Sequence, residues 1–242
     1  MLRNTRGIVI HRFNYGETSL VARIFTRELG MQSYLVRGAR KSRSKKKQML
    51  FQPLTLVNMA VYHKDRDSLQ HMKEVSLLEP YHSIPHDIGK SSQVLFLAEV
   101  FSHALKRQEA HHGLFDFLQQ GLLLLDREAG PRPFFHLVFM LQLSRFLGFQ
   151  PRNNLDKHHP FFNLAEGLYQ SVRAQPETCL DSRLSQLFFQ LSNTSLMDCG
   201  SLSAGREDRK ILVRKIIDYY RHHVAEMPEL RSLEVLESVF AD

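Results

Sequence analysis

The strongest chemical signal in the sequence is a run of positive charge between residues 37 and 47. Seven of these eleven residues are Lys or Arg, namely Arg37, Arg40, Lys41, Arg43, Lys45, Lys46 and Lys47. The run has no apolar residue larger than Ala39, so it cannot pack into a core. Clustered ammonium and guanidinium groups displace the counterions of a nucleic acid, which makes binding steeply dependent on salt. The alternative interpretation is a solubilising or targeting-like charge run.

The charge of the whole chain is unevenly distributed. Its 242 residues carry 32 Lys and Arg against 25 Asp and Glu, a formal net charge of +7. The first 50 residues contain twelve of the cations and only two carboxylates, Glu17 and Glu28, whereas the remainder is slightly acidic. A strong local field of one sign is an argument about partners. It predicts a polyanion as the ligand of the N-terminal region.

Residues that could catalyse a reaction or bind a metal are sparse. Three pairs of adjacent histidines are poor metal ligands, because the side chains of adjacent residues point in different directions. Glu109 and His112 have the spacing of one half of a di-iron motif, but no second half follows. Cys179 and Cys199 lack the close spacing of a zinc site. Phosphate loop, Rossmann glycine and nucleophile elbow patterns are absent. We therefore expect no catalytic residue, no metal and no cofactor.

Aromatic residues are interleaved with the basic residues of the N-terminal region. They are Phe13, Tyr15, Phe25, Tyr34, Phe51 and Tyr62. Proteins that bind single-stranded nucleic acids stack bases on exposed aromatic rings, although most of these six side chains must belong to the core. We expect Tyr15, which lies in a turn, and Tyr34 to be exposed. With Arg23 and the basic run, they complete the predicted nucleic-acid-binding residues.

The first 80 residues are expected to form a small β-barrel. Five segments have the composition of short strands separated by turn residues, at residues 7–13, 18–26, 31–36, 54–62 and 69–78. An open sheet of this size would leave edges that the sequence does little to protect, whereas a closed barrel of the oligonucleotide-binding (OB) type has none. The predicted fold class is therefore α+β with more than one domain. Residues 1–80 form a five-stranded OB-fold barrel, and residues 81–242 form an all-helical domain.

After residue 80, the spacing at which apolar residues recur changes from two residues to about 3.6 residues. We expect helices at residues 85–107, 114–125, 133–146, 184–191, 208–224 and 232–240. In the first of them, Ile88, Leu95, Ala98, Phe101 and Leu105 are expected to share the buried face. No segment reaches the roughly 18 apolar residues of a membrane span, and no secretory signal is evident. The expected location is the cytoplasm.

Several short motifs run through residues 1–150. They are Gly7-Ile8-Val9-Ile10, Tyr15-Gly16-Glu17-Thr18-Ser19, Ile24-Phe25-Thr26-Arg27-Glu28-Leu29-Gly30, Val36-Arg37-Gly38-Ala39-Arg40-Lys41 and Gln52-Pro53-Leu54, then Asp87-Ile88-Gly89-Lys90-Ser91 and Phe96-Leu97-Ala98-Glu99-Val100. In these motifs the chain resembles the RecO family of bacterial DNA repair and recombination mediators. The resemblance implies an OB-fold barrel followed by a helical domain, and it implies a non-enzymatic role.

The resemblance also implies specific partners. Members of the family bind single- and double-stranded DNA, anneal complementary strands, bind RecR and the single-strand DNA-binding protein, and help to load the RecA recombinase. They work in the cytoplasm on the nucleoid. Many relatives carry a four-cysteine zinc insertion, but at most Cys179 and Cys199 remain here. Zinc is therefore not carried over, and the chain is expected to fold without it.

The acidic, Phe-ended tail of the single-strand DNA-binding protein requires a groove with an apolar floor and a basic rim. The candidate rim residues on the helical domain are Lys106, Arg107, Arg127, Arg132, Arg145 and Arg152. Two other interpretations of the whole chain remain open. It could be an RNA-binding or ribosome-associated OB-fold module, or a protein-interaction adaptor without affinity for nucleic acid.

Overall fold

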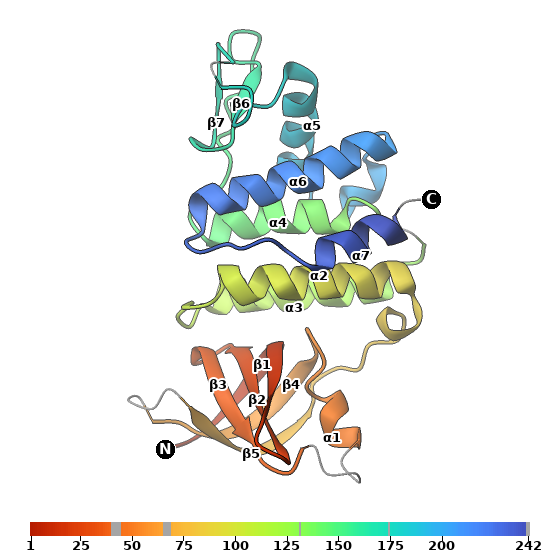
Figure 1. Cartoon of the computed structure of the whole chain (residues 1–242). Helices are drawn as coiled ribbons and strands as arrows, with labels where there is room; N and C mark the ends of the chain where they lie inside the picture. Colours follow the sequence, from red (N-terminus) through yellow and green to blue (C-terminus); the bar gives the residue numbers. More distant parts are fainter. Residues whose placement is uncertain (40–44, 65–68, 131, 174, 241–242) are drawn as a thin grey trace. The chain divides into compact units, whose positions relative to one another are not determined.

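The structure is a computed structural model, which describes the chain except for residues 40–44, 65–68, 131, 174 and 241–242 and the side chains of Lys45 and Lys46. The chain divides into two compact units, Met1–Arg127 and Glu128–Asp242 (Figure 1). No helix in the described ranges is both long and apolar enough to cross a membrane.

The first unit begins with a closed β-barrel. The described residues contribute the strands β1 (Leu2–Tyr15), β2 (Ser19–Thr26), β3 (Gly30–Val36), β4 (Leu56–Tyr62) and β5 (Gln70–Leu77), and a short helix α1 (Lys45–Met49) precedes β4. Their order around the barrel is β1-β2-β3-β5-β4, with β1 paired antiparallel to both β2 and β4. The predicted OB-fold barrel is confirmed.

Strand alternation places one set of side chains inside the barrel. The interior is filled by apolar residues of every strand, including Val9, Ala22, Tyr34 and Val61. Gly7 faces the same interior, and a Cβ atom there would lie 2.6 Å from Ile24 Cγ2. The missing side chain at Gly7 therefore lets β1 pass close to β2.

Two long helices complete the first unit. After the 3-10 turn η1 (Ile84–His86), α2 (Ile88–Ala104) and α3 (His112–Arg127) follow. The helices are confirmed. The expected buried face of α2 is confirmed at Ala98, Phe101 and Leu105 but is wrong at Ile88 and Leu95, which are exposed. Apolar side chains surround most of α2, so their spacing does not select one face.

The second unit is helical around a small hairpin. Its described elements are α4 (Phe135–Phe146), β6 (Phe161–Asn163), β7 (Leu168–Gln170), α5 (Ser182–Asn193), η2 (Asp198–Ser201), α6 (Arg206–His223) and α7 (Ser232–Val239). The expectation of an entirely helical second half is wrong at β6 and β7. The Asn154 side chain supports β7 as a further strand would, because its amide and carbonyl groups bond Tyr169 O and N at 2.9 and 3.0 Å.

A buried carboxylate fixes the start of the helical part of the first unit. Asp126, at the end of α3, accepts hydrogen bonds from the main-chain N–H groups of His82, Ser83 and Ile84 at 2.8–2.9 Å. Burial raises the pKa of the Asp126 carboxyl, but these hydrogen bonds outweigh it and hold the pKa below its ordinary value. The carboxylate therefore ties the chain that leaves the barrel to the end of α3.

Replacing this carboxylate with an amide is expected to destabilise the first unit. An Asn side chain has one acceptor atom and places an NH2 group against main-chain donors, so Asp126→Asn should lower the free energy of unfolding by about 2 kcal/mol. Urea denaturation followed by circular dichroism measures the change. Glu229→Gln, which neutralises an exposed carboxylate, is the control and should leave the midpoint unchanged. Equal midpoints for the two variants would contradict this role of Asp126.

Candidate nucleic-acid interface

The outer surface of the barrel carries a row of side chains that crosses all its strands. The pairing registers join Phe13 to Val21, Val21 to Leu35, Leu35 to His71 and His71 to Tyr62. Paired residues point to the same face of a sheet, and this face is opposite the one that fills the core. Phe13 and Tyr62 are 46% and 48% exposed, whereas Val21 is covered by its neighbours. We call these five residues the outer row.

Two predicted binding residues lie beside the outer row. Tyr15 pairs with Ser19 one step further along β1 and β2. The expected exposure of Tyr15 is confirmed at 52%. Arg37 directly follows β3 and is exposed, and extending the register of β2 and β3 by one residue places it next to Ser19. Tyr15 and Arg37 therefore share a face with Phe13 and Leu35.

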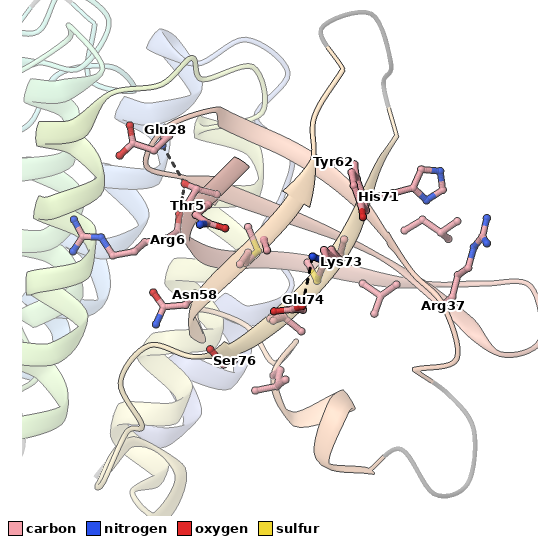
Figure 2. Close-up of a pocket in the computed structure, with 18 of the residues that line it drawn as sticks. Thr5, Arg6, Glu28, Arg37, Asn58, Tyr62, His71, Lys73, Glu74 and Ser76 are labelled. Carbon is pink, nitrogen blue, oxygen red and sulfur yellow. Dashed lines mark hydrogen bonds and ion pairs between the residues drawn. The ribbon is translucent and has the colours of Figure 1, made fainter. Parts of the chain in front are cut away.

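A large hollow borders the same row (Figure 2). It has a volume of about 1330 Å³, and Leu35, His71 and Tyr62 of the outer row line it. Among the described residues, its charged lining consists of Arg6, Arg37, Lys47, Lys64 and Lys73 against Glu28 and Glu74. The hollow is therefore a cationic surface next to exposed rings, the combination with which proteins hold single-stranded nucleic acids.

Part of the predicted basic run belongs to this hollow. Lys47 Nζ donates a hydrogen bond to the main-chain oxygen of Arg37 at 3.1 Å, which brings the two ends of the run together. Arg40, Lys41 and Arg43 lie outside the described residues, and so do the side chains of Lys45 and Lys46.

Tyr34 and Arg23 have structural surroundings that the sequence did not predict. The expected exposure of Tyr34 is wrong, because its side chain is 0% exposed and points into the barrel with Val36. Burial also raises the pKa of its hydroxyl well above the ordinary value. Arg23 is partly buried, and it donates a hydrogen bond to the main-chain oxygen of Lys106 at 3.0 Å. Arg23 thus joins β2 to the end of α2.

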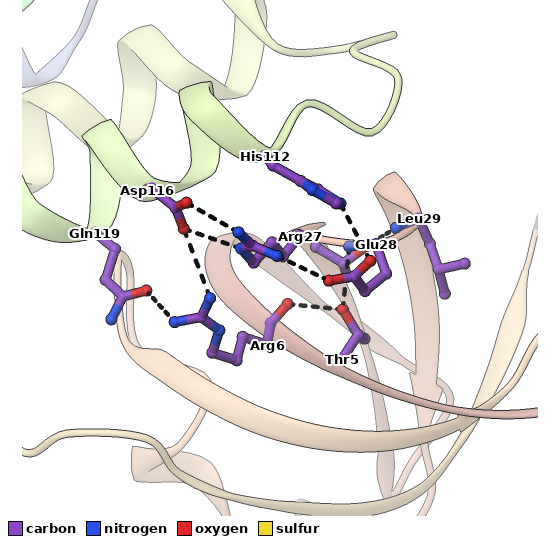
Figure 3. A network of polar contacts seen from close by, with 9 residues as sticks. Thr5, Arg6, Arg27, Glu28, Leu29, His112, Asp116 and Gln119 are labelled. Carbon is purple, nitrogen blue, oxygen red and sulfur yellow. Dashed lines mark hydrogen bonds and ion pairs between the residues drawn. The ribbon is translucent and has the colours of Figure 1, made fainter.

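Other basic residues of the N-terminal region are held by Asp116 and Gln119 of α3 (Figure 3). Both oxygens of Asp116 accept hydrogen bonds from Arg27 at 3.0 Å. Arg6 lies 3.6 Å from the same carboxylate and donates to Gln119 at 3.2 Å. The hydrogen bonds from Arg27 hold the pKa of the Asp116 carboxyl below its ordinary value. Arg6 and Arg27 therefore fasten the barrel to α3.

The predicted partner-binding cations differ in their exposure and in their contacts. Arg107 and Arg152 are exposed, Arg127 binds Glu79 at 2.8 Å, and Arg145 donates to Gln142 at 2.9 Å. Lys106 is exposed at the end of α2. The side chain of Arg132 is only 14% exposed and contacts Glu128, Met197 O and Cys199 Sγ. The burial of Arg132 argues against contact with a partner.

A second hollow in the second unit has an apolar floor and charged residues of both signs. Its volume is about 310 Å³, and it lies between α4, α6 and α7. Val213, Leu236 and Phe240 form the floor, and the exposed Arg206 and Lys210 line it together with Arg209, Glu234 and Glu237. None of the six predicted rim residues lines it among the residues that the structure describes.

No group of three or more His, Cys, Asp and Glu residues is placed to hold a metal ion within the described part of the chain. Cys179 and Cys199 are both buried and unbridged. Burial raises the pKa of the Cys199 thiol, which disfavours the thiolate that a metal needs.

Comparison with known proteins gives matches over nearly the whole chain. Residues 1–81 match the family model described as "Recombination protein O N terminal", and residues 85–234 match "Recombination protein O C terminal". The DNA repair protein RecO of Flavobacterium psychrophilum is 36% identical over 98% of each chain. The proteins of the same name from Bacteroides fragilis and Phocaeicola vulgatus are 35% and 36% identical, over at least 99% of this chain and all of theirs.

Proposed function

The chain belongs to the RecO family of DNA repair proteins, and from this premise we propose that it is a recombination mediator that binds single- and double-stranded DNA. The observation that carries the proposal is the outer row, because its exposed Tyr62 ring lines the cationic hollow on an OB-fold barrel. OB-fold barrels bind oligonucleotides on such faces. The proposed ligand contacts are bases on Phe13 and Tyr62 and phosphates on Arg37 and the rest of the basic run.

The same surface would anneal complementary strands without making or breaking a covalent bond. Two nucleic acid backbones repel each other, and a surface that neutralises their phosphates lowers this repulsion. Phosphate contacts carry no sequence information, so base pairing alone selects the complementary strand. No catalytic residue enters this mechanism.

The proposed mediator also requires protein partners. We propose that the chain acts with RecR, binds the acidic tail of the single-strand DNA-binding protein and helps to load RecA onto DNA covered by that protein. The second hollow supports the tail contact, because Arg206 and Lys210 could bind acidic residues while its apolar floor holds a terminal ring. The exposed Lys106, Arg107 and Arg152 remain candidates for the same contact.

Removing the exposed rings of the outer row is expected to weaken DNA binding. Stacking is worth about 1–3 kcal/mol per base, so Phe13→Ala and Tyr62→Ala should each lower the affinity for a 30-nucleotide single strand about fivefold or more. Fluorescence anisotropy with a labelled oligonucleotide measures the affinity. The slope of affinity against salt should stay unchanged, because these variants keep every phosphate contact.

The control is Ile88→Ala, which removes an exposed apolar side chain from α2 instead of the barrel. Unchanged affinity in both ring variants would remove the outer row from the proposal. Competition with RNA of the same sequence separates the alternatives, since an RNA-binding module would prefer RNA and a protein adaptor would bind neither strand.

A further inference from the structure

Among the described residues, one strand of the barrel is paired along its length on one side and over only two residues on the other. β5 pairs with β4 from His71 to Leu77. On its other side, among the described residues, β3 pairs with β5 only at Gln70 and His71. The barrel therefore closes through a short contact, and most of β5 continues past it as an unpaired edge.

The main-chain groups along this edge can be assigned from the neighbouring strand. Leu78 donates its N–H group to Leu56 O on the β4 side at 2.9 Å. Because main-chain groups alternate between the two sides of a strand, Ser76 also faces β4, whereas Val75 and Leu77 face away from it. In the part of the chain that the structure describes, no hydrogen bond satisfies Val75 or Leu77 on that side. Unpaired N–H and C=O groups of this kind are a template for another strand.

Apolar side chains accompany the unpaired edge. Met72 and Val75 of β5 and Leu50 after α1 pack against the barrel core but remain partly exposed. All three line the hollow of Figure 2, and Leu77 at the end of β5 is exposed. An added strand would therefore have both a main-chain ladder and an apolar surface to cover.

The charges of the hollow indicate what kind of strand fits. Among the described residues, five cationic side chains line it against two carboxylates. Arg6 is held by Asp116, and Lys73 lies 3.9 Å from Glu74. The remaining cations still outnumber the carboxylates, so an acidic segment is favoured over a basic one. Lys73 and Glu74 project from β5 itself, and charges on an edge discourage pairing of two copies of the same edge. DNA has no repeating amide donors and acceptors, so it cannot satisfy Val75 and Leu77 as a peptide does.

We propose that the free edge of β5 binds an acidic, extended segment of a partner protein, which adds to the barrel as a further strand. Binding by strand addition takes its affinity from main-chain hydrogen bonds and its selectivity from alternate side chains. In this arrangement the apolar side chains of the segment cover Met72 and Val75, and its carboxylates face the basic lining. The inference is independent of the proposed DNA binding, although the two ligands share the hollow.

The experiment uses the full chain and a synthetic peptide, acetyl-Glu-Val-Glu-Ile-Glu-Val-Glu-amide. Amide hydrogen exchange is followed by nuclear magnetic resonance with and without saturating peptide. The exchange of the Val75 and Leu77 amides should slow about tenfold or more, while that of the Ser76 amide, which already faces β4, should not change. The same peptide with Lys in place of Glu should give no protection. Unchanged exchange at Val75 and Leu77, or protection confined to other elements, would overturn the proposal.

A variant of β5 tests the ladder directly. Val75→Pro removes an N–H group that faces away from β4, a position where edge strands tolerate proline, and it should weaken peptide binding at least about tenfold. Val75→Asp keeps the N–H group but adds a carboxylate that repels the acidic peptide. It replaces the proline variant in the experiment if that variant does not fold. Unweakened peptide binding in the folded variants would overturn the proposal. DNA affinity is measured in parallel, so a loss of peptide binding with intact DNA binding is distinguished from a failure of the proposed function.

Discussion

Reversing Arg40, Lys41, Lys45, Lys46 and Lys47 together to glutamate is expected to lower the affinity for single-stranded DNA about a thousandfold or more at low salt. Each phosphate contact on a single strand contributes about 0.7 to the slope of log affinity against log salt. Five lost contacts therefore remove most of a sequence-independent binding energy, and five new carboxylates repel the strand. The slope itself should fall by about 3.5.

The matched control reverses five exposed cations of the second unit, Arg152, Lys157, Arg206, Lys210 and Arg221. It changes the net charge of the chain by the same amount. If binding depended only on net charge, the two variants would lose affinity equally. The proposed interface fails if the barrel variant keeps its affinity, or if the control loses as much.

The barrel could be predicted because its strands have clear local patterns. Residues 18–26 are mostly apolar or β-branched and are bounded by turn residues, and β2 is found at Ser19–Thr26. The hairpin of β6 and β7 could not be predicted in the same way. Its strands have three residues each, too few to show alternation, and they depend on the distant Asn154 side chain.

The site was predicted only in part, because the sequence of a short apolar strand does not show which of its alternate residues face the core. β3 reads Gly-Met-Gln-Ser-Tyr-Leu-Val, so either Tyr34 or Leu35 could face the core. Packing decides for Tyr34, because it pairs with Ala22 of the barrel interior. Phe13 and Tyr15 are two residues apart on β1, so their side chains point to the same face. This spacing could have identified Phe13 as a second exposed ring.

Long-range contacts account for the remaining differences. Tyr62 and His71 join the outer row only through the pairing of β3 with β5, which no local pattern encodes. Arg6 and Arg27 count toward the basic excess in the sequence, but Asp116 lies 89 residues from Arg27 and still binds it. Charge patterning predicts a partner for a region, whereas the fold determines which cations remain for that partner.

The second unit is expected to lose stability as the pH falls below 6.5 because of one buried histidine. His136 of α4 is buried, and burial together with the positive charge of Arg209 lowers its pKa from 6.5 to about 3. Between these values the unfolded chain binds a proton at this site and the folded chain does not. The free energy of unfolding is therefore not reduced by His136 above pH 6.5. Below pH 6.5 it decreases by up to 1.4 kcal/mol per pH unit, which amounts to about 3 kcal/mol at pH 4.5.

The variant His136→Gln separates this contribution from that of the other histidines. It removes the titrating group, so its unfolding free energy should depend less steeply on pH between 6.5 and 4.5 than that of the parent chain, whatever its stability at neutral pH. Urea denaturation at several pH values measures the slope, and His158→Gln, at an exposed position, is the control. A direct titration of the His136 ring by nuclear magnetic resonance should show a neutral imidazole down to pH 4.5. Protonation of the ring near pH 6 in the folded chain would contradict the effect of burial, because a buried imidazolium beside Arg209 is disfavoured by both desolvation and repulsion.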